Sequence, residues 1–411
     1  MKTGQNFRKF MLLWAGELIS QIGGGLSSFG LGVYIFHQTG RAADMALITL
    51  LGFLPGLLLS VPAGVLADRY DRRLLMMVGD GCSGLGIVFI LVCMMNGGAT
   101  LTQIAAGVCV SSVFSSLLEP SYKATITDLL TKEEYSKANG LVSLAGSAKY
   151  LFSPIIAGFL LSISDIKLLL QIDIGTFFFT VLCTAVVRKG IAARKAEATA
   201  EPFLQRLKAG WQAVHDRPGV CRLVWIASAV TLFMGVFQVL AAPLVLSFAD
   251  AKLLGIAETI CACGMLASGI VLGIWGIKGH FIRVLSISLA LAGIAMFGFA
   301  MFARILPMCV FGFLFFATLP FANNCLDYLT RVHIPDDFQG RAWGLIGFLS
   351  QLGYVAAYSI SGVAADALGR LTGRGAGGGS AMMILFSGVC LAIIALRIPM
   401  GKALRDLEKE A

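Results

Sequence analysis

Three charged side chains stand inside long apolar stretches of this chain, where they are positioned to move protons. Glu17 and Glu119 are carboxylic acids, and Lys149 is a base. If these stretches cross a membrane, an ionised group near the bilayer centre costs roughly 2.5–3.5 kcal/mol, so it marks a functional candidate. We predict that Glu17 or Glu119 takes up a proton and that Lys149, paired with Glu119, tunes that uptake. The alternative is a static ion pair that holds two segments together.

The composition predicts that these residues are carried by membrane-spanning helices. Of the 411 residues, 57% are apolar and 13% are charged, about half the charged share of soluble domains. The apolar residues form stretches of about 20, long enough for a helix to cross a bilayer core, and backbone groups in lipid must bond within their own helix. No ten-residue alternating strands of a β-barrel are visible. We therefore expect an all-α membrane protein with twelve spans, near 10–36, 44–67, 74–95, 101–127, 137–163, 168–187, 222–248, 253–276, 284–303, 306–330, 342–365 and 381–398.

The distribution of basic residues predicts the orientation of these spans. The net charge is +9, and most Lys and Arg fall on connections that share one side, above all 188–222. Positive connections stay in the cytoplasm, so we expect both termini there and a bacterial cytoplasmic membrane location. The excess of basic residues then reflects the orientation of the protein in the membrane, and we expect no nucleic acid as a partner. The first apolar stretch is too long for a cleavable signal and is interpreted as the first span.

The chain divides into two halves that are related to each other. We expect an N-terminal six-helix bundle over 1–187, a cytoplasmic linker with an amphipathic helix over 188–219, and a C-terminal six-helix bundle over 220–411. Residues 137–141 (K-A-N-G-L) match 341–345 (R-A-W-G-L), and further matches continue in register. Repeats of this kind place a binding site between two halves that rock about it. The two bundles should therefore be pseudo-symmetric.

Short motifs give the chain a family resemblance. Residues 64–73 read G-V-L-A-D-R-Y-D-R-R, which resembles the loop between spans 2 and 3 of the major facilitator superfamily, except that the family has glycine where Asp71 stands. The segments W-A-G-E-L-I-S-Q-I-G (14–23), F-L-P-G (53–56), P-S-Y (120–122) and A-N-G-L (138–141) are similar to the macrolide-efflux branch, which also resembles siderophore exporters. The arginine that drug antiporters of the superfamily often carry in span 4 is absent from 111–114.

The resemblance implies a secondary active transporter rather than an enzyme. It predicts proton-coupled efflux of amphipathic small molecules by alternating access, in a monomer surrounded by lipid. A nutrient importer or facilitator and a lipid or lysolipid flippase remain alternatives on the same fold. The sequence contains no nucleotide-binding loop, no H-E-x-x-H and no zinc spacing among its ten cysteines, so we expect no cofactor and no metal.

Polar and aromatic residues on the expected spans are candidates for a substrate cavity. An aromatic cavity with a few polar groups suits a large amphipathic ligand. Ser111, Ser115 and Glu119 are four residues apart, so they should form one stripe on a continuous helix. The candidates are Gln21, Ser111, Ser115, Phe233, Phe237, Gln238, Asn323, Asn324, Tyr354 and Tyr358. Further embedded acids, among them Asp80, Asp173 and Asp327, are interpreted as structurally paired or wetted.

The charged loop at 64–73 is a candidate cytoplasmic gate. Asp68 ends span 2, close to where span 11 should begin, and a helix N-terminus attracts a carboxylate. Arg72 or Arg73 should reach Asp128 at the end of span 4. We predict that these contacts latch the halves together when the cytoplasmic side is closed; a purely topological role is the alternative. The gate residues are Asp68, Arg69, Arg72, Arg73, Asp128 and Arg341.

Overall fold

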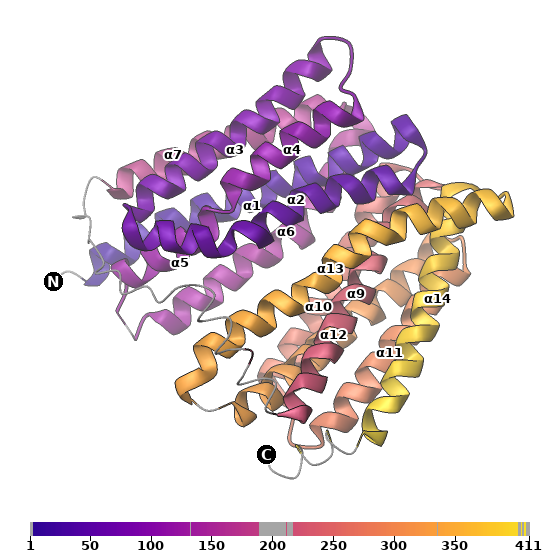
Figure 1. Cartoon of the computed structure of the whole chain (residues 1–411). Helices are drawn as coiled ribbons and strands as arrows, with labels where there is room; N and C mark the ends of the chain where they lie inside the picture. The colour runs from indigo at the N-terminus through magenta and orange to yellow at the C-terminus, as the bar shows by residue number, and fades with distance from the viewer. Residues whose placement is uncertain are drawn as a thin grey trace. The chain divides into compact units, whose positions relative to one another are not determined.

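The computed structural model is built from helices, coloured along the chain in Figure 1. It describes residues 3–131, 133–188, 211, 217–334, 336–401, 404 and 407, with side chains left out at 3–5, 136 and 336–342. The chain separates into two compact units, Met1–Gln38 with Leu47–Ala200 and Thr39–Ala46 with Glu201–Ala411. The amphipathic helix expected within 203–214 lies outside the described residues, apart from Trp211.

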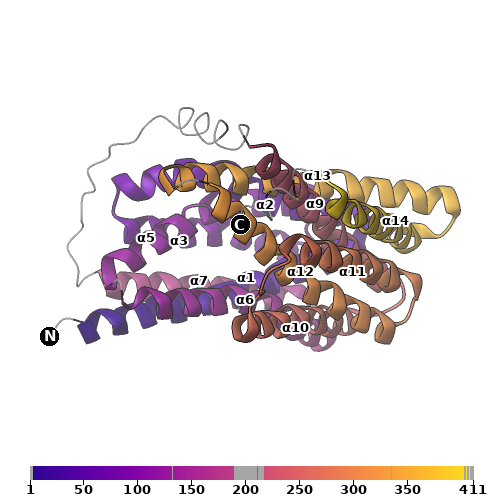
Figure 2. The same cartoon turned by 90° about the horizontal axis from the view of Figure 1, so that it is seen from below.

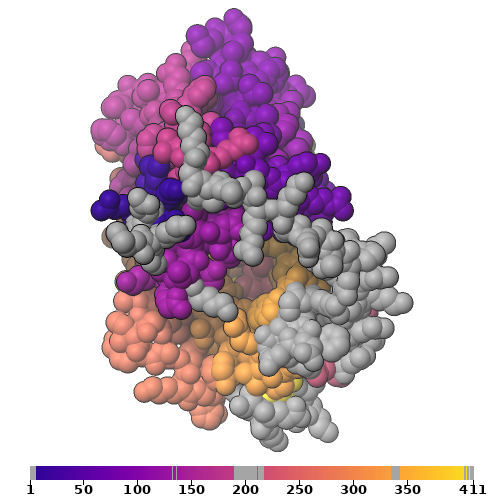
Figure 3. Space-filling model, turned by 90° about the vertical axis from the view of Figure 1, so that its left-hand side faces the viewer, coloured from indigo at the N-terminus to yellow at the C-terminus, as the bar shows by residue number. Residues whose placement is uncertain are grey.

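The first unit contains the helices of the N-terminal half. They are α1 (Thr3–Thr39), α2 (Ala42–Arg69, from Leu47 on), α3 (Arg72–Met95), α4 (Leu101–Ser115), α5 (Leu118–Leu129), α6 (Tyr135–Ile163) and α7 (Ile166–Arg188). Within this unit, α3 packs against α4, α5 and α7. Figure 2 shows α3 close to α5 and α7. One end of the unit appears in space-filling form in Figure 3, where the indigo residues of α1 lie close to the last turns of α7. Buried Phe10 and Val187 belong to one cluster there.

The second unit contains the C-terminal half. Its helices are α9 (Pro218–Leu246), α10 (Ala251–Trp275), α11 (Phe281–Met301), α12 (Ile305–His333), α13 (Asp336–Thr372), α14 (Gly375–Arg397) and the 3-10 turn η1 (Ile398–Met400). Within the unit, α9 packs against α13 and α14, and α11 packs between α12 and α14. The first turn of α2 also belongs to this unit. The Asp366 carboxylate accepts hydrogen bonds from the amides of Ala42 and Ala43, each 2.9 Å long, and thereby caps that turn.

Twelve helical segments of the described chain are long and apolar enough to span a membrane. Many of their large apolar side chains are exposed, including Phe178 and Leu306, which are 69% and 76% accessible. Such faces suit lipid, where an apolar surface is not penalised. The prediction of an all-α protein with twelve spans is confirmed.

The fourth span differs from the continuous helix expected over 101–127. It consists of α4 and α5, with a break at residues 116–117. Pro120 has no amide hydrogen, so it cannot bond back to the carbonyl of Ser116. The Ser116 hydroxyl donates to Val113 O at 2.6 Å, and the amide of Leu117 bonds to Phe114 O in a tighter turn. The predicted single stripe of Ser111, Ser115 and Glu119 is therefore wrong, because the break separates Glu119 from the two serines.

Two pairs of glycines allow helices to approach backbone to backbone. A Cβ added at Gly107 on α4 would lie 2.7 Å from the carbonyl oxygen of Gly86 on α3. In the second unit, a Cβ at Gly388 on α14 would lie 2.6 Å from the carbonyl oxygen of Gly293 on α11. Membrane helices lack a hydrophobic driving force toward one another and depend on such close van der Waals packing.

Candidate functional site

Helix α1 is held in the first unit by hydrogen bonds to its carbonyl groups from α7 and α6. The Thr180 hydroxyl donates to Gly16 O at 3.3 Å, and the Ser153 hydroxyl donates to Ile22 O at 2.9 Å. Glu17 lies between these two anchors and is half-buried. The Gln21 amide donates to the Glu17 carboxylate at 2.7 Å, since the two residues are one turn apart. This arrangement fixes the acid at a defined place in the span.

Two fully buried acids accompany Glu17 in the first unit. Asp80 on α3 is 2% exposed and Asp173 on α7 is 1% exposed. Among the described residues, Asp80 Oδ1 has no hydrogen-bond partner, and Asp80 interacts electrostatically with Glu17 and Asp173. Because a buried, unpartnered carboxylate oxygen is costly, this acid cluster (Glu17, Asp80 and Asp173) calls for an explanation beyond packing.

A buried polar seam on α7 carries one member of the acid cluster. Asp173, Thr176, Thr180 and Thr184 recur at helical spacing and are all buried. The Thr176 hydroxyl lies 3.4 Å from Asp173 Oδ1, and a Cβ added at Gly23 on α1 would lie 2.9 Å from the same oxygen. The carboxyl therefore faces α1 across the seam. Sequence reasoning missed this role, although the spacing of the threonines was a readable signal.

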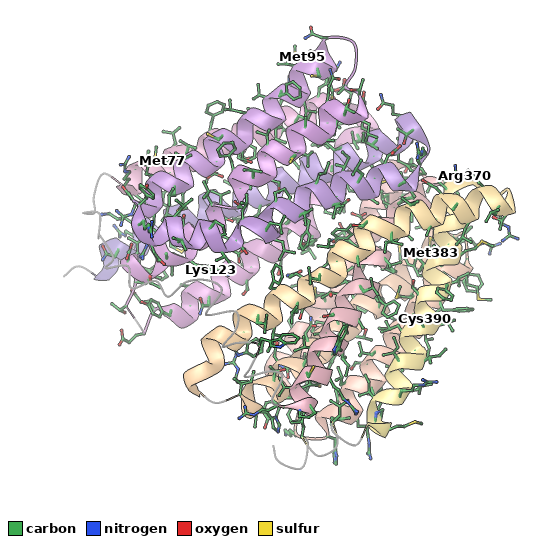
Figure 4. All side chains as sticks on the ribbon, in the orientation of Figure 1. Met77, Met95, Lys123, Arg370, Met383 and Cys390 are labelled. Carbon is green, nitrogen blue, oxygen red and sulfur yellow. The ribbon has the colours of Figure 1, made fainter. Side chains whose placement is uncertain are left out.

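The partners of Glu119 and Lys149 differ from the predicted pair. Glu119 is exposed, and its carboxylate lies 2.6 Å from Lys123 Nζ, one turn later on α5. Lys149 on α6 is half-buried, and its Cγ would lie 3.2 Å from a Cβ added at Gly25 on α1. The charge of Lys149 acts on Asp173. Figure 4 shows Lys123 toward the same end of the first unit as Met77, away from Met95. The predicted Glu119–Lys149 pair is wrong, because Lys123 is nearer along the helix.

The two serines predicted to line a cavity instead join α3 to α4. The hydroxyl of Ser83, which is fully buried, lies 2.7 Å from that of Ser111 and 2.8 Å from that of Ser115. The hydroxyls of Ser111 and Ser115 therefore already form hydrogen bonds within the first unit. Of the candidates in this half, Gln21 and Glu17 stay together as the sequence spacing indicated.

The charged loop between α2 and α3 is organised around Arg72. Its guanidinium lies 2.7 Å from the Asp128 carboxylate, as predicted, and it also donates to the carbonyls of Ala67 at 3.2 Å and Ala124 at 3.1 Å. Asp68 is 3.9 Å from Arg72 and its side chain is 64% exposed. Arg73 is buried and Arg69 is exposed. The side chain of Arg341, on α13, lies outside the described residues.

Asp71, which replaces the glycine of the usual pattern, has a structural role. Its carboxylate caps α3 by accepting a hydrogen bond from the amide of Arg73 at 3.1 Å. The other carboxylate oxygen lies 2.8 Å from Arg188 at the end of α7. An aspartate is a favoured residue at this capping position. Through its contact with Arg188, Asp71 also joins the loop to α7, which is the sixth span.

Most of the aromatic candidates of the second unit are packed in its core. Phe233 and Phe237 are 8% and 2% exposed, and Phe237 stacks on Phe315 with ring centroids 4.4 Å apart. The Tyr354 hydroxyl lies 2.9 Å from Met234 Sδ, and the Tyr358 hydroxyl donates to Gln238 Oε1 at 2.6 Å. These tyrosines tie α13 to α9. Asn323, Asn324 and Gln238 are exposed.

A pocket of about 200 Å³ lies between α9, α12 and α13 of the second unit. Its walls combine apolar side chains with a few polar ones, and one of its lining residues is acidic. The lining residues are Leu223, Val224, Ala227, Thr231, Asn323, Leu326, Asp327, Thr330, Trp343, Ile346, Gly347 and Ser350. Of the sequence candidates, Asn323 alone lines it; Asp327 was expected to be paired or wetted.

In the described chain, twelve span-length helices in two compact units, with polar groups embedded in both, define a polytopic α-helical membrane protein. A family model described as Major Facilitator Superfamily matches residues 13–358, and the chain belongs to that superfamily. Its members are transporters rather than enzymes. The resemblance seen in the sequence is confirmed, and with it a multi-pass location in the bacterial cytoplasmic membrane.

Two of the relatives are efflux proteins by name. The chain is 24% identical over 416 residues to Macrolide efflux protein A of Streptococcus pyogenes, covering 97% of both chains. It is 22% identical over 374 residues to the multidrug efflux pump Tap of Mycolicibacterium fortuitum, covering 87% of this chain and 90% of Tap. These similarities support efflux transport.

Solved structures share the fold. A bacterial homologue of the human lysosomal transporter Spinster, inward-facing and unoccupied, superimposes with a TM-score of 0.75 at 13% identity, covering 98% of both chains. A bacterial homologue of the iron transporter ferroportin, also inward-facing, gives a TM-score of 0.72 at 14% identity, covering 95% of this chain and 98% of the other. At these identities the likeness concerns the fold alone.

Proposed function

We propose that the chain is a proton-driven exporter of amphipathic small molecules, with both termini in the cytoplasm. The observation that carries the proposal is the acid cluster of Glu17, Asp80 and Asp173 in the first unit. Ionisable groups inside membrane spans serve proton relays in pumps and transporters. The macrolide and multidrug efflux relatives support the direction of transport and the amphipathic class of substrate.

Glu17 is the member of the cluster best placed to exchange its proton. It is half-buried, whereas Asp80 and Asp173 are almost fully enclosed. Its carboxylate accepts a hydrogen bond from Gln21 at 2.7 Å, and Glu119 and Asp80 are its acidic neighbours. A half-buried carboxyl inside a membrane span, held by one side-chain donor, is suited to exchange a proton during a transport cycle. We propose that Asp80 and Asp173 share the change in charge that occurs when Glu17 gains or loses its proton.

Proton coupling is tested in everted membrane vesicles by replacing Glu17 with glutamine. With an imposed pH gradient and radiolabelled erythromycin as probe, uptake by Glu17→Gln is expected to fall to the level reached without a gradient, because the amide cannot take up a proton. Erythromycin-dependent proton release, read with a pH-sensitive dye, should disappear with it.

Two control variants make this experiment decisive. Glu17→Asp retains an acid and should keep gradient-driven uptake. Glu119→Gln removes an exposed carboxylate that pairs with Lys123, and we expect a smaller effect from it. If Glu17→Gln keeps full gradient-driven uptake, the assignment of Glu17 as the coupling acid is wrong. Absence of erythromycin transport by the unchanged protein, with active control vesicles, would count against macrolides as substrates.

Asp68 serves, in this proposal, as the movable member of the cytoplasmic gate that the sequence predicts. Its side chain is largely exposed and only loosely engaged by Arg72, at 3.9 Å. We expect Asp68→Asn to lower transport and to shift the population of inward- and outward-facing states, as measured by distances between paired spin labels. Asp165→Asn, which removes another exposed acid, is the matched control. Equal transport and an equal population in both variants would exclude the gate.

A further inference from the structure

We propose that the pocket between α9, α12 and α13 binds the protonated amine of a cationic amphipathic substrate, with Asp327 as its counter-ion. This inference rests on the proposed function, because it names the substrate class of the exporter. The site lies wholly in the second unit and is separate from the acid cluster of the first.

Two hydroxyls of the pocket lining and its one carboxylate are arranged as acceptors. The Ser350 hydroxyl donates its proton to Ile346 O at 2.7 Å, and the Thr231 hydroxyl donates to the carbonyls of Ser228 and Ser350. Each hydroxyl oxygen then has lone pairs but no proton left to offer a ligand. The Asp327 carboxylate is an acceptor as well when ionised. A ligand head group that carries several N–H donors matches such a lining.

The charge of Asp327 is available to a ligand. No described basic residue lies within 4.0 Å of its carboxylate. Arg331 is one turn away and acts on Asp327 electrostatically, but its guanidinium lies over the Trp343 ring, 5.8 Å from the centroid. The carboxylate therefore has no close ion-pair partner among the described side chains. An ammonium group would supply one.

The size and walls of the pocket define the part of the substrate that enters. About 200 Å³ is the volume of roughly seven liquid waters, below the 300–1,000 Å³ usual for sites that enclose a whole drug-sized ligand. Leu223, Leu326 and Ile346 surround the polar groups with apolar surface. The pocket thus accommodates an alkylammonium head with short apolar substituents, while the rest of the molecule lies outside it.

Equilibrium binding to the purified full-length protein in lipid nanodiscs tests the site. The probes are tritiated 1-naphthylmethylamine, which is a cation at neutral pH, and 1-naphthylmethanol, its neutral counterpart of nearly equal shape. We expect the unchanged protein to prefer the amine. Asp327→Asn should weaken amine binding by about tenfold to a hundredfold, the value of a hydrogen bond to a charged group. It should leave alcohol binding unchanged.

Control variants separate the site from effects on folding. Asp165→Asn, an exposed acid of the other unit, should bind like the unchanged protein. Thr231→Val removes an acceptor without removing charge and should weaken amine binding several-fold, which keeps the test usable if Asp327→Asn fails to fold. Equal binding of amine and alcohol by the unchanged protein, or full amine binding by folded Asp327→Asn, overturns the assignment. If Asp327→Asn does not fold, full amine binding by Thr231→Val overturns it.

The binding assay needs no proton gradient, so it is independent of the export experiment. A protein that binds the amine through Asp327 but transports neither erythromycin nor the amine when a pH gradient is imposed contradicts the proposed function and leaves this site standing. A protein that exports erythromycin but lacks amine binding dependent on Asp327 contradicts the site alone.

Discussion

Replacing Gly107 by leucine is expected to abolish the accumulation of folded protein. A Cβ at this position would lie 2.5 Å from Ile90 Cγ1 and 2.7 Å from the carbonyl oxygen of Gly86. The isoleucine can rotate away, but the backbone of α3 cannot without separating α3 from α4. Overpacking of this kind costs about 1–3 kcal/mol and sometimes more, and a leucine extends the clash beyond its Cβ. The amount of monodisperse protein after detergent extraction measures the result.

Two glycine variants on the same unit calibrate this prediction. Gly107→Ala adds the Cβ alone and should give an intermediate yield and a lower unfolding temperature. Gly175 on α7 is exposed with nothing within 4 Å of an added Cβ, so Gly175→Ala should be neutral or stabilising by up to about 1 kcal/mol through helix propensity. A normal yield for Gly107→Leu would mean that α3 and α4 are not packed through these glycines.

Replacing Arg72 by alanine is expected to cause the second large loss. The substitution removes the ion pair with Asp128 and the hydrogen bonds to the carbonyls of Ala67 and Ala124. The side chains of Arg72 and Asp128 are 19% and 16% exposed, so the remaining carboxylate stays mostly shielded from water. Breaking a buried pair costs about 3–5 kcal/mol, and partial exposure places this one near the lower end. Thermal unfolding in detergent measures the change.

Neighbouring residues provide the comparison for Arg72. Arg69 is exposed, and its replacement by alanine should change stability by less than about 0.5 kcal/mol. Combining Arg72→Ala with Asp128→Ala should recover part of the loss, because the unpaired charge is then gone. Equal unfolding temperatures for Arg72→Ala and Arg69→Ala would show that the pair does not stabilise the loop.

The extent of the spans could be predicted from sequence because it depends on apolar length. The segments expected at 74–95 and 253–276 correspond to α3, Arg72–Met95, and α10, Ala251–Trp275. The break between α4 and α5 was missed, since both parts are apolar and Pro120 alone marks the interruption. Lys123, which pairs with Glu119, could have been predicted from the sequence, because it follows Glu119 by four residues, the spacing of helical ion pairs.

The candidate site was harder to predict because it depends on contacts between distant segments. Asp80 and Asp173 are 93 residues apart in sequence and act on each other only after α3 packs against α7. The aromatic residues of α9 and α12 have the same composition whether they face a cavity or a core, and the structure places Phe237 in the core. Asp327 belongs to a pocket made by three helices. Spacing along one helix carries no information of this kind.

The division of the fourth span into α4 and α5 has an electrostatic consequence for Glu119. Two helices in series have two macrodipoles, so the partly positive amino end of α5 lies within the span rather than at its edge. Glu119 stands in the first turn of α5, where such a field favours a negative side chain. The backbone at the break thus offers Glu119 a favourable place within the span, beside Lys123 and without Lys149.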